Sequence, residues 1–444
     1  MAVYCTWLLV FWPGVVGNDT LAVLLESDTQ GDFRSGKSVL WYYLVHATYG
    51  STKRVEVALL VLLALCALIF ARMLSWYWVN GHRRAALLML LLIGLAPHTV
   101  YFLGTLYPDG IFAVAACGLL FELWLCTQRK AVSTSSVLML ALTLPLALFT
   151  RANGIAFLLP AIACLWFVRR PDRLKLGALI AASCALGFGA QAVHKPSNQS
   201  ALDSMVLFET VNFLRPHAMD DLWLMYPTAN DPWVLRKPRV TPLTLQTLDA
   251  HTPREKLQAF SDPGYWDMLV FHPKGPQFLT LSDAQRQVLR HEFFRHNLWR
   301  NVPEFLGSRV TVFFTAALAQ GGMPALDWAP NILPATQATS RFRAFELTGA
   351  EQVLRKLHRA SYQGRWLLWT PFVGIFMAAA LLLRRRSTAP ARWIGLSLLI
   401  QLAGIVALSS AGEYRYLLVF FVAPLALWPM FSSGPPAGSP PAAR

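Results

Sequence analysis

Repeated apolar runs dominate this chain and restrict what it can fold into. Ten of them qualify as candidate membrane spans, several near the lower limit of about 17 residues for a crossing helix. They are Val3–Val16, Val55–Val79, Ala85–Leu103, Gly110–Cys126, Val137–Phe149, Ile155–Val168, Leu174–Val193, Trp366–Leu383, Trp393–Ser410 and Leu417–Phe431. With 55% hydrophobic and 14% charged residues among 444, the chain is too apolar for a soluble protein. The sequence therefore predicts an all-α membrane protein, a polytopic helical bundle of about ten spans.

Short basic clusters between the runs set the expected orientation. Ten crossings place all four clusters on one side, which the positive-inside rule identifies as the cytoplasm. The clusters are His82–Arg84, Arg129–Lys130, Arg169–Lys175 and Arg384–Arg392. The opposite, periplasmic side then holds Asp19, Asp109, Arg151, the segment 194–365 and Glu413–Tyr416. This sorting accounts for the net charge of +15 without a nucleic-acid partner.

These boundaries divide the chain into four parts. Residues 1–193 are expected to form an N-terminal transmembrane bundle with catalytic outer loops, and 194–365 a periplasmic segment. Residues 366–431 supply the last spans. The tail 432–444, rich in Pro and Gly, is expected to be disordered. The first run has no basic residues before it, so we interpret it as a retained span rather than a signal peptide.

One apolar run, Val310–Ala319, does not fit the pattern. It is too short to cross a bilayer, and a crossing there would place the last basic cluster outside. We interpret Pro303–Gln320 as a helix in the outer interface, with Arg300 and Arg309 near lipid headgroups. A core helix of the external segment is an equally good interpretation.

Two acidic residues stand at the outer ends of apolar runs. Asp19 follows the first run, and Asp109 follows the third, in Tyr107-Pro108-Asp109. A carboxylate beside hydrocarbon is costly unless it is paired or functional. With its pKa raised by partial burial, such a group could accept a proton from an attacking hydroxyl. The simpler alternative is that both are loop or helix-capping residues.

Two arginines are expected on the same side. Arg151 lies in a predicted turn, Arg151-Ala152-Asn153-Gly154, and Arg415 lies in Glu413-Tyr414-Arg415-Tyr416. A guanidinium group matches phosphate oxygens in a bidentate way, so both are candidates for holding a leaving phosphate. The alternative is that each only extends to the membrane interface.

Other site types are disfavoured by the sequence. The six cysteines lie in apolar stretches without zinc spacing, and the histidines of the external segment are scattered. No dinucleotide fingerprint or nucleophile elbow is present, and Gly31–Ser38 lacks the phosphate-loop pattern. We therefore expect no cofactor and no dedicated metal site.

Taken in order, these motifs resemble those of GT-C-fold glycosyltransferases that use polyprenyl-phosphate sugars. The chain is similar to bacterial relatives of the protein mannosyltransferases and aminoarabinose transferases. The matching elements are Asp19 after the first span, Tyr107-Pro108-Asp109, the turn Arg151–Gly154, and Arg415-Tyr416 followed by Pro424. The resemblance implies catalytic roles for Asp19 and Asp109 and donor-phosphate binding by Arg151, Arg415 and Tyr416. Thr20 stands where many relatives have a second acidic residue, and a late His-Pro element of the first loop is missing.

The expected function is that of an inverting membrane glycosyltransferase in the bacterial inner membrane, with its active site on the periplasmic side. It would move a sugar from a polyprenyl-phosphate donor to a glycan or glycolipid acceptor. Alternatives are a glycan polymerase or ligase using diphosphate-linked oligosaccharide, a transporter or flippase, and a non-catalytic assembly protein. A transporter usually places polar residues mid-span and shows internal repeats, and neither is evident here.

Overall fold

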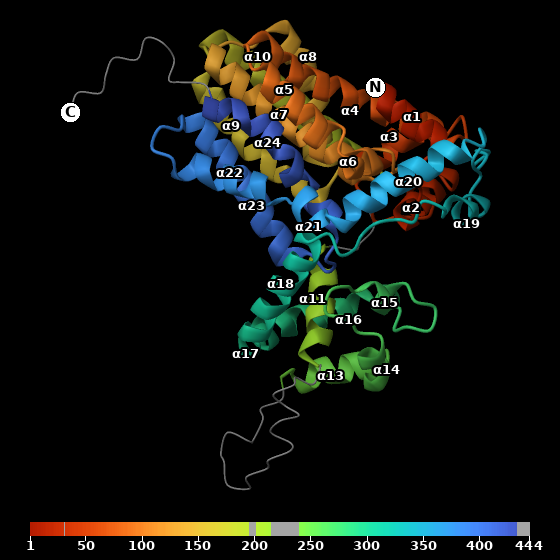
Figure 1. Cartoon of the computed structure of the whole chain (residues 1–444). Coiled ribbons are helices and arrows are strands. Elements are labelled where there is room, and N and C mark those ends of the chain that lie inside the picture. The colour runs from red at the N-terminus through yellow and green to blue at the C-terminus, as the bar shows by residue number, and fades with distance from the viewer. Residues whose placement is uncertain (31, 195–200, 215–238, 433–444) are drawn as a thin grey trace. The chain divides into compact units, whose positions relative to one another are not determined.

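The structure is a computed structural model, and it describes residues 1–30, 32–194, 201–214 and 239–432. About 74% of the chain is helical, and the described residues form no β-strand. Two compact units are present (Figure 1). The first comprises Met1–Asn198, Ala317–Ala403 and Tyr414–Arg444, and the second comprises Gln199–Ala316 and Gly404–Glu413. The expected disordered tail lies outside the described residues, apart from Ser432.

The first unit contains the helices that can cross a membrane. Among the described residues, six helices are long and apolar enough, and a bent pair brings the number up to seven. The six are α4 (Val55–Val79), α7 (Pro108–Arg129), α10 (Arg170–Val193), α21 with α22 (Arg365–Leu368, Phe372–Leu383), α23 (Ala389–Leu408), and η8 with α24 (Tyr414–Leu417, Leu418–Ser432). An all-α membrane protein is therefore confirmed, whereas a count of ten spans stays a prediction.

Several expected spans are shorter or broken. The first run forms only α1 (Ala2–Val10), and the run at 155–168 is divided among short helices. Those are η2 (Ala152–Phe157), α9 (Leu158–Cys164) and η3 (Leu165–Phe167). The run at 85–103 forms α5 (Arg83–Met89), η1 (Leu90–Gly94) and α6 (Pro97–Leu103), with a bend of 59°. Pro97 lacks an amide proton and disfavours helical backbone at Ala96, which explains the break.

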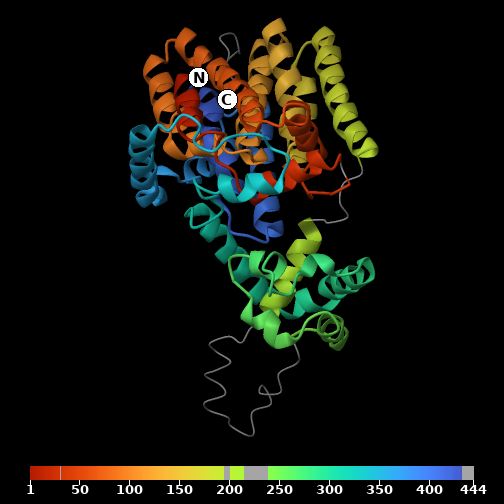
Figure 2. The same cartoon turned by 90° about the vertical axis from the view of Figure 1, so that its right-hand side faces the viewer.

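Helix α7 forms the centre of the first unit. It is buried along its whole apolar window and packs on α4, α24 and α8 (Thr134–Phe149). Small residues allow this close packing: a Cβ on Gly118 would lie 2.5 Å from Ile69 Cγ2. Helices α8 and α10 lie side by side at the edge of the unit (Figure 2). The N-terminal turn of α7, which begins at Pro108 and contains Asp109, is buried as well.

The second unit has a hydrophobic core of its own, formed by residues of its short helices. Its helices are α11 (Ala201–Phe213), α13 (Pro242–Asp249), α14 (Arg254–Ala259), α15 (Asp267–Val270), η5 (Phe278–Thr280), α16 (Asp283–Glu292), η6 (Phe293–Asn297), α17 (Leu298–Arg300) and α18 (Val302–Ala317). The expected headgroup contact of Arg309 is wrong. Arg309 is buried, forms an ion pair with Glu209 and donates to the Ser409 carbonyl at 2.5 Å. Burial of its partner inside the unit draws this arginine inward.

Residues 317–365, which we grouped with the periplasmic segment, pack with the first unit. They form α19 (Ala329–Ile332), η7 (Leu333–Ala335) and α20 (Thr348–Gln363). Helix α20 packs on α1 and α6. Two further short helices, α2 (Asn18–Asp28) and α3 (Val39–Tyr49), form the loop after α1.

A buried ion pair joins α4 to α7, and it provides a test of the packing. Arg72 Nε lies 2.5 Å from Glu122 Oε1, and the Glu122 side chain is fully buried. Glu122→Ala should lower the free energy of unfolding by about 3–5 kcal/mol, because Arg72 would keep an uncompensated charge. The measurement is thermal unfolding in detergent. Replacing both Glu122 and Arg72 by leucine removes the pair as a whole and should restore most of the stability. Equal losses in the single and double variants would contradict this assignment.

Candidate functional site

Two short segments of the first unit run side by side and bring the two acidic residues together. The Val15 amide donates to the Gly104 carbonyl at 3.0 Å, and the Leu106 amide donates back to the Val15 carbonyl. The Thr20 hydroxyl donates to the Leu106 carbonyl at 3.3 Å. These bonds fix the start of α2 against the segment that enters α7. Asp19 and Asp109 each lie in the first turn of their helix, but the N-caps are Gly17 and Tyr107, so neither acid is the capping residue.

Gly17 makes this close approach possible. A Cβ at this position would lie 2.2 Å from the Tyr107 hydroxyl and 2.7 Å from Pro324 Cβ. Since neither distance is tolerated, only glycine allows the chain to pass here. Close packing therefore requires glycine at the first residue of the segment Gly17-Asn18-Asp19.

Asp109 is buried and pairs with Arg151. Arg151 Nη1 donates to Asp109 Oδ1, and the Asp109 side chain is only 1% exposed. Arg151 precedes the tight turn that the sequence predicts, in which the Gly154 amide donates to the Arg151 carbonyl at 3.0 Å. A Cβ on Gly154 would lie 2.2 Å from the Ala147 carbonyl oxygen, so this turn also needs glycine. The turn holds Arg151 at the start of α7 rather than at the lipid surface.

Arg415 connects the two carboxylates. It lies in η8, directly before α24, and α24 packs on α7. Arg415 Nη1 is 2.5 Å from Asp19 Oδ2 and 3.8 Å from Asp109 Oδ2. Its side chain is 9% exposed. Arg151 and Arg415, 264 positions apart in the sequence, thus both lie at Asp109, and Arg415 also contacts Asp19.

Tyrosine rings hold the guanidinium groups in place. Arg151 lies over the ring of Tyr416 at 4.7 Å, and Arg415 lies 5.5 Å from that same ring. Arg415 also lies 4.7 Å from the ring of Tyr107. Such contacts fix the direction of the guanidinium plane. All five predicted site residues therefore lie together in the first unit.

Lys37 also belongs to the cluster, although it was not among the predicted site residues. Its Nζ atom lies 2.6 Å from Asp19 Oδ1, so Asp19 contacts two cations. Ser38, the next residue, is the N-cap of α3, and its hydroxyl donates to the Phe149 carbonyl near Arg151. The sequence did contain one indication that this part of the loop is ordered. Ser38 stands before an aromatic helical run, which is an N-terminal capping pattern.

The expected raised pKa of Asp19 is wrong. Burial alone would raise the pKa, but the charges of Arg415 and Lys37, with the hydrogen bonds they donate, hold the pKa of Asp19 below its usual range. Asp19 is therefore ionised at neutral pH and is a weak base while both cations remain bound to it. The sequence could not predict this, because one cation was overlooked and the other lies 396 positions away.

Among the ion pairs that the structure describes in this cluster, the cations outnumber the anions. Arg151, Arg415 and Lys37 face Asp19 and Asp109, which leaves one positive charge among groups that are mostly buried. Such a site favours an anion with several oxygens, which can replace the carboxylates at the guanidinium groups. In the described part of the chain, no group of three or more His, Cys, Asp or Glu side chains is placed to hold a metal ion.

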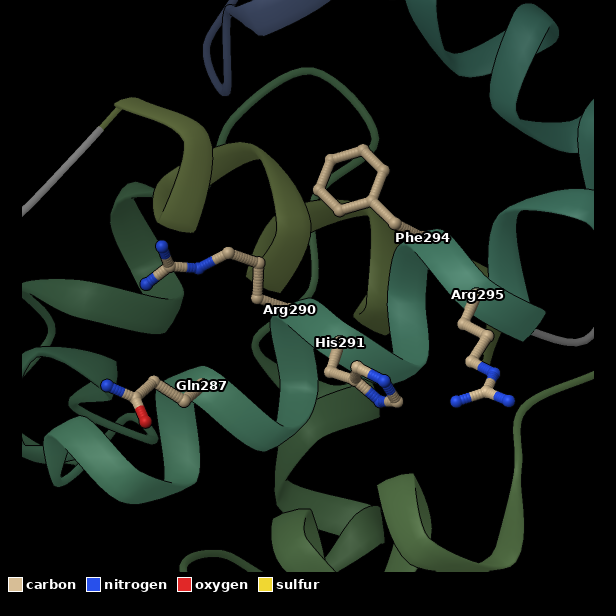
Figure 3. Close-up of a pocket in the computed structure, with 5 residues that line it drawn as sticks. All are labelled: Gln287, Arg290, His291, Phe294 and Arg295. Carbon is tan, nitrogen blue, oxygen red and sulfur yellow. The ribbon is translucent and has the colours of Figure 1, made fainter.

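The second unit contains an open pocket of different chemistry, with a volume of about 460 Å³. Figure 3 shows its described lining residues on successive turns of α16 and η6: Gln287, Arg290, His291, Phe294 and Arg295. None of these five is acidic, and none is a predicted site residue. His291 could act as a base there, but these five residues do not combine acidic and basic groups as the cluster in the first unit does, so the pocket is a weaker candidate for catalysis.

Fold and site together define an all-α membrane protein with a buried charge cluster at one end of its central helices. Comparisons of the chain with protein-family models, with curated proteins and with solved structures find no significant match. The function must therefore be inferred from the site itself.

Proposed function

We propose that this protein is an inverting GT-C-type glycosyltransferase that uses a sugar linked to polyprenyl phosphate. The observation that supports it is the convergence of Asp19, Asp109, Arg151 and Arg415 on one cluster. Of two carboxylates, one can accept the proton of an attacking hydroxyl and the other can orient the acceptor. Two guanidinium groups can bind a leaving phosphate. The site lies within the membrane-spanning unit, which suits a donor with a long apolar tail.

Donor binding would itself activate the base in this mechanism. The phosphate competes with Asp19 for Arg415 and Lys37, because both are anions that can pair with these two cations. Once these cations turn to the phosphate, the pKa of Asp19 rises toward its usual range or above it. Asp19 then becomes a better proton acceptor only when donor is present.

Asp109 is suited to orient the acceptor. Its Oδ2 atom is buried and makes no hydrogen bond to any described residue, although Oδ1 accepts from Arg151. A buried acceptor without a hydrogen bond usually indicates a missing partner. One hydroxyl of the acceptor could donate to Asp109 Oδ2. A second hydroxyl of the same acceptor, the nucleophile, would then face Asp19.

The reaction then balances without a further reactant. The acceptor oxygen forms a bond to the anomeric carbon as the bond from that carbon to the phosphate oxygen breaks. The hydroxyl proton passes to Asp19, and the electron pair of the broken bond stays on polyprenyl phosphate. Arg151, Arg415 and Lys37 stabilise the charge of the leaving group. Membranes containing the protein should convert a radiolabelled polyprenyl-phosphate sugar into labelled envelope glycan, and failure to do so would contradict the proposal.

The proposed location is the bacterial inner membrane, with the site and the second unit on the periplasmic side. In a background without the partly exposed Cys5 and Cys184, a cysteine at position 287 should react with a membrane-impermeant maleimide in intact spheroplasts. A cysteine at the exposed position 130, in a basic cluster, should react only after permeabilisation. Labelling of position 130 in intact spheroplasts would overturn the orientation.

A further inference from the structure

Helix α20 has one packed side and one exposed side, and the charge cluster includes neither. One side packs on other residues of the first unit: the His358 ring stacks on Tyr101 at 4.8 Å, and the Ser361 hydroxyl accepts from the Trp369 indole at 2.7 Å. The other side is exposed along the length of the helix. An α-helix with one packed side and one free side must meet either water, lipid or a partner on the free side.

The position of α20 ties it to the membrane boundary. One residue after its end, the chain enters the candidate span Arg365–Leu383. Helix α20 therefore cannot lie far from the place where that span leaves the bilayer. Figure 1 shows α20 running across the direction of α7 and α24 rather than along it. These observations place α20 along the membrane surface rather than through it.

The exposed side of α20 is divided lengthwise. Val353 and Leu357, one helical turn apart, are 64% and 54% exposed. Lys356 and Arg359, which are also exposed, project from the other part of the same side. Packed, apolar and basic strips thus follow one another around the helix. This is the arrangement of a helix half-immersed in a bilayer surface.

Two basic side chains on the helix remain available for an outside partner. Arg355 is occupied by ion pairs with Glu351 and Asp327. Burial lowers the pKa of His358 to about 4, so this ring is neutral at physiological pH. Among the described residues, Lys356 and Arg359 form no ion pair, and both can contact negative charge near the surface.

We propose that α20 is an interfacial helix that binds anionic phospholipid headgroups through Lys356 and Arg359, with Val353 and Leu357 inserted among the acyl chains. The apolar surface continues at the start of the following span, where Trp366 and Leu367 are 65% and 62% exposed. This continuity with lipid-facing residues favours a bilayer over a protein partner. The inference does not depend on sugar transfer.

The test uses the full-length protein in nanodiscs or mild detergent. Native mass spectrometry measures the phosphatidylglycerol and phosphatidylcholine that stay bound after equilibration with equal amounts of both. The wild type should prefer phosphatidylglycerol. The double variant Lys356→Gln, Arg359→Gln should bind it about 25-fold more weakly, since each basic residue near an anionic surface contributes roughly fivefold.

A matched control removes two exposed basic residues from the second unit, by Lys274→Gln with Arg295→Gln, and should leave the preference unchanged. A photoreactive benzoylphenylalanine at position 357 should form an adduct with the mass of a phospholipid. Equal binding of both lipids by the wild type, an unchanged preference in the α20 variant, or a crosslink from position 357 to another protein chain would each overturn the proposal.

Discussion

Asp19→Asn should reduce sugar transfer by about 10²–10⁴-fold, the usual contribution of a positioned base. The substitution keeps the size of the side chain and can still accept a hydrogen bond from Arg415 or Lys37, so the site should stay assembled. It removes the group that takes the proton. The measurement is initial rate of transfer from a polyprenyl-phosphate sugar in detergent, with protein amount and melting temperature matched to the wild type.

The control for Asp19 is Asp32→Asn in the same outer loop. Asp32 is exposed and lies outside the cluster, so its loss should leave the rate within about twofold of the wild type. Asp109→Asn should be impaired, but less than Asp19→Asn, because Asp109 has the orienting role. Near-normal turnover by Asp19→Asn would remove the proposed base from the mechanism.

The second large effect is expected at Arg415. Arg415→Gln should slow transfer by about 10²–10³-fold, the cost of losing one preorganised group that stabilises developing charge. Arg415→Lys keeps the charge but loses the planar guanidinium, whose Nη1 contacts Asp19 and approaches Asp109, so it should be impaired to an intermediate degree. Arg151→Lys should be impaired in the same way.

Measurements of turnover and of product binding test whether Arg415 holds the leaving phosphate. If it holds the leaving phosphate, Arg415→Gln should lower kcat and weaken binding of polyprenyl phosphate, the product. Arg385→Gln removes an exposed arginine from a predicted cytoplasmic cluster and should change neither. If Arg415→Lys were as active as the wild type, a point charge would suffice, and the bidentate phosphate role would be wrong.

The sequence predicted the members of the cluster better than its electrostatics. Asp19, Asp109, Arg151 and Arg415 could be selected because each is a charged residue next to an apolar run, where charge is costly. Their mutual contacts depend on the packing of α7 against α24 and on the strand-like segment at Val15, which join parts of the chain far apart in sequence. Lys37 looked like an ordinary loop lysine, so the depressed pKa of Asp19 could not be foreseen.

The helical membrane class followed from hydropathy, but the helix boundaries did not. Hydropathy sums side-chain transfer free energies and contains no information on breaks in the backbone. One predicted span therefore continued through the bend before Pro97. It also merged α1 with the non-helical segment that carries the chain to Asp19. Arg309 was predicted to contact lipid headgroups because it is a basic residue at an apolar run. Its acidic partner Glu209 lies in α11, so the local sequence contained no indication of the ion pair.

The central claim is most directly tested by mass spectrometry of lipid-linked sugars and envelope glycans in cells that have the wild-type protein, the Asp19→Asn variant or no protein. We expect that a polyprenyl-phosphate sugar accumulates in the variant and in the deletion, and that one envelope glycan or glycolipid loses the matching sugar in both. Lipid-linked sugars and envelope glycans that are identical in all three strains would contradict it.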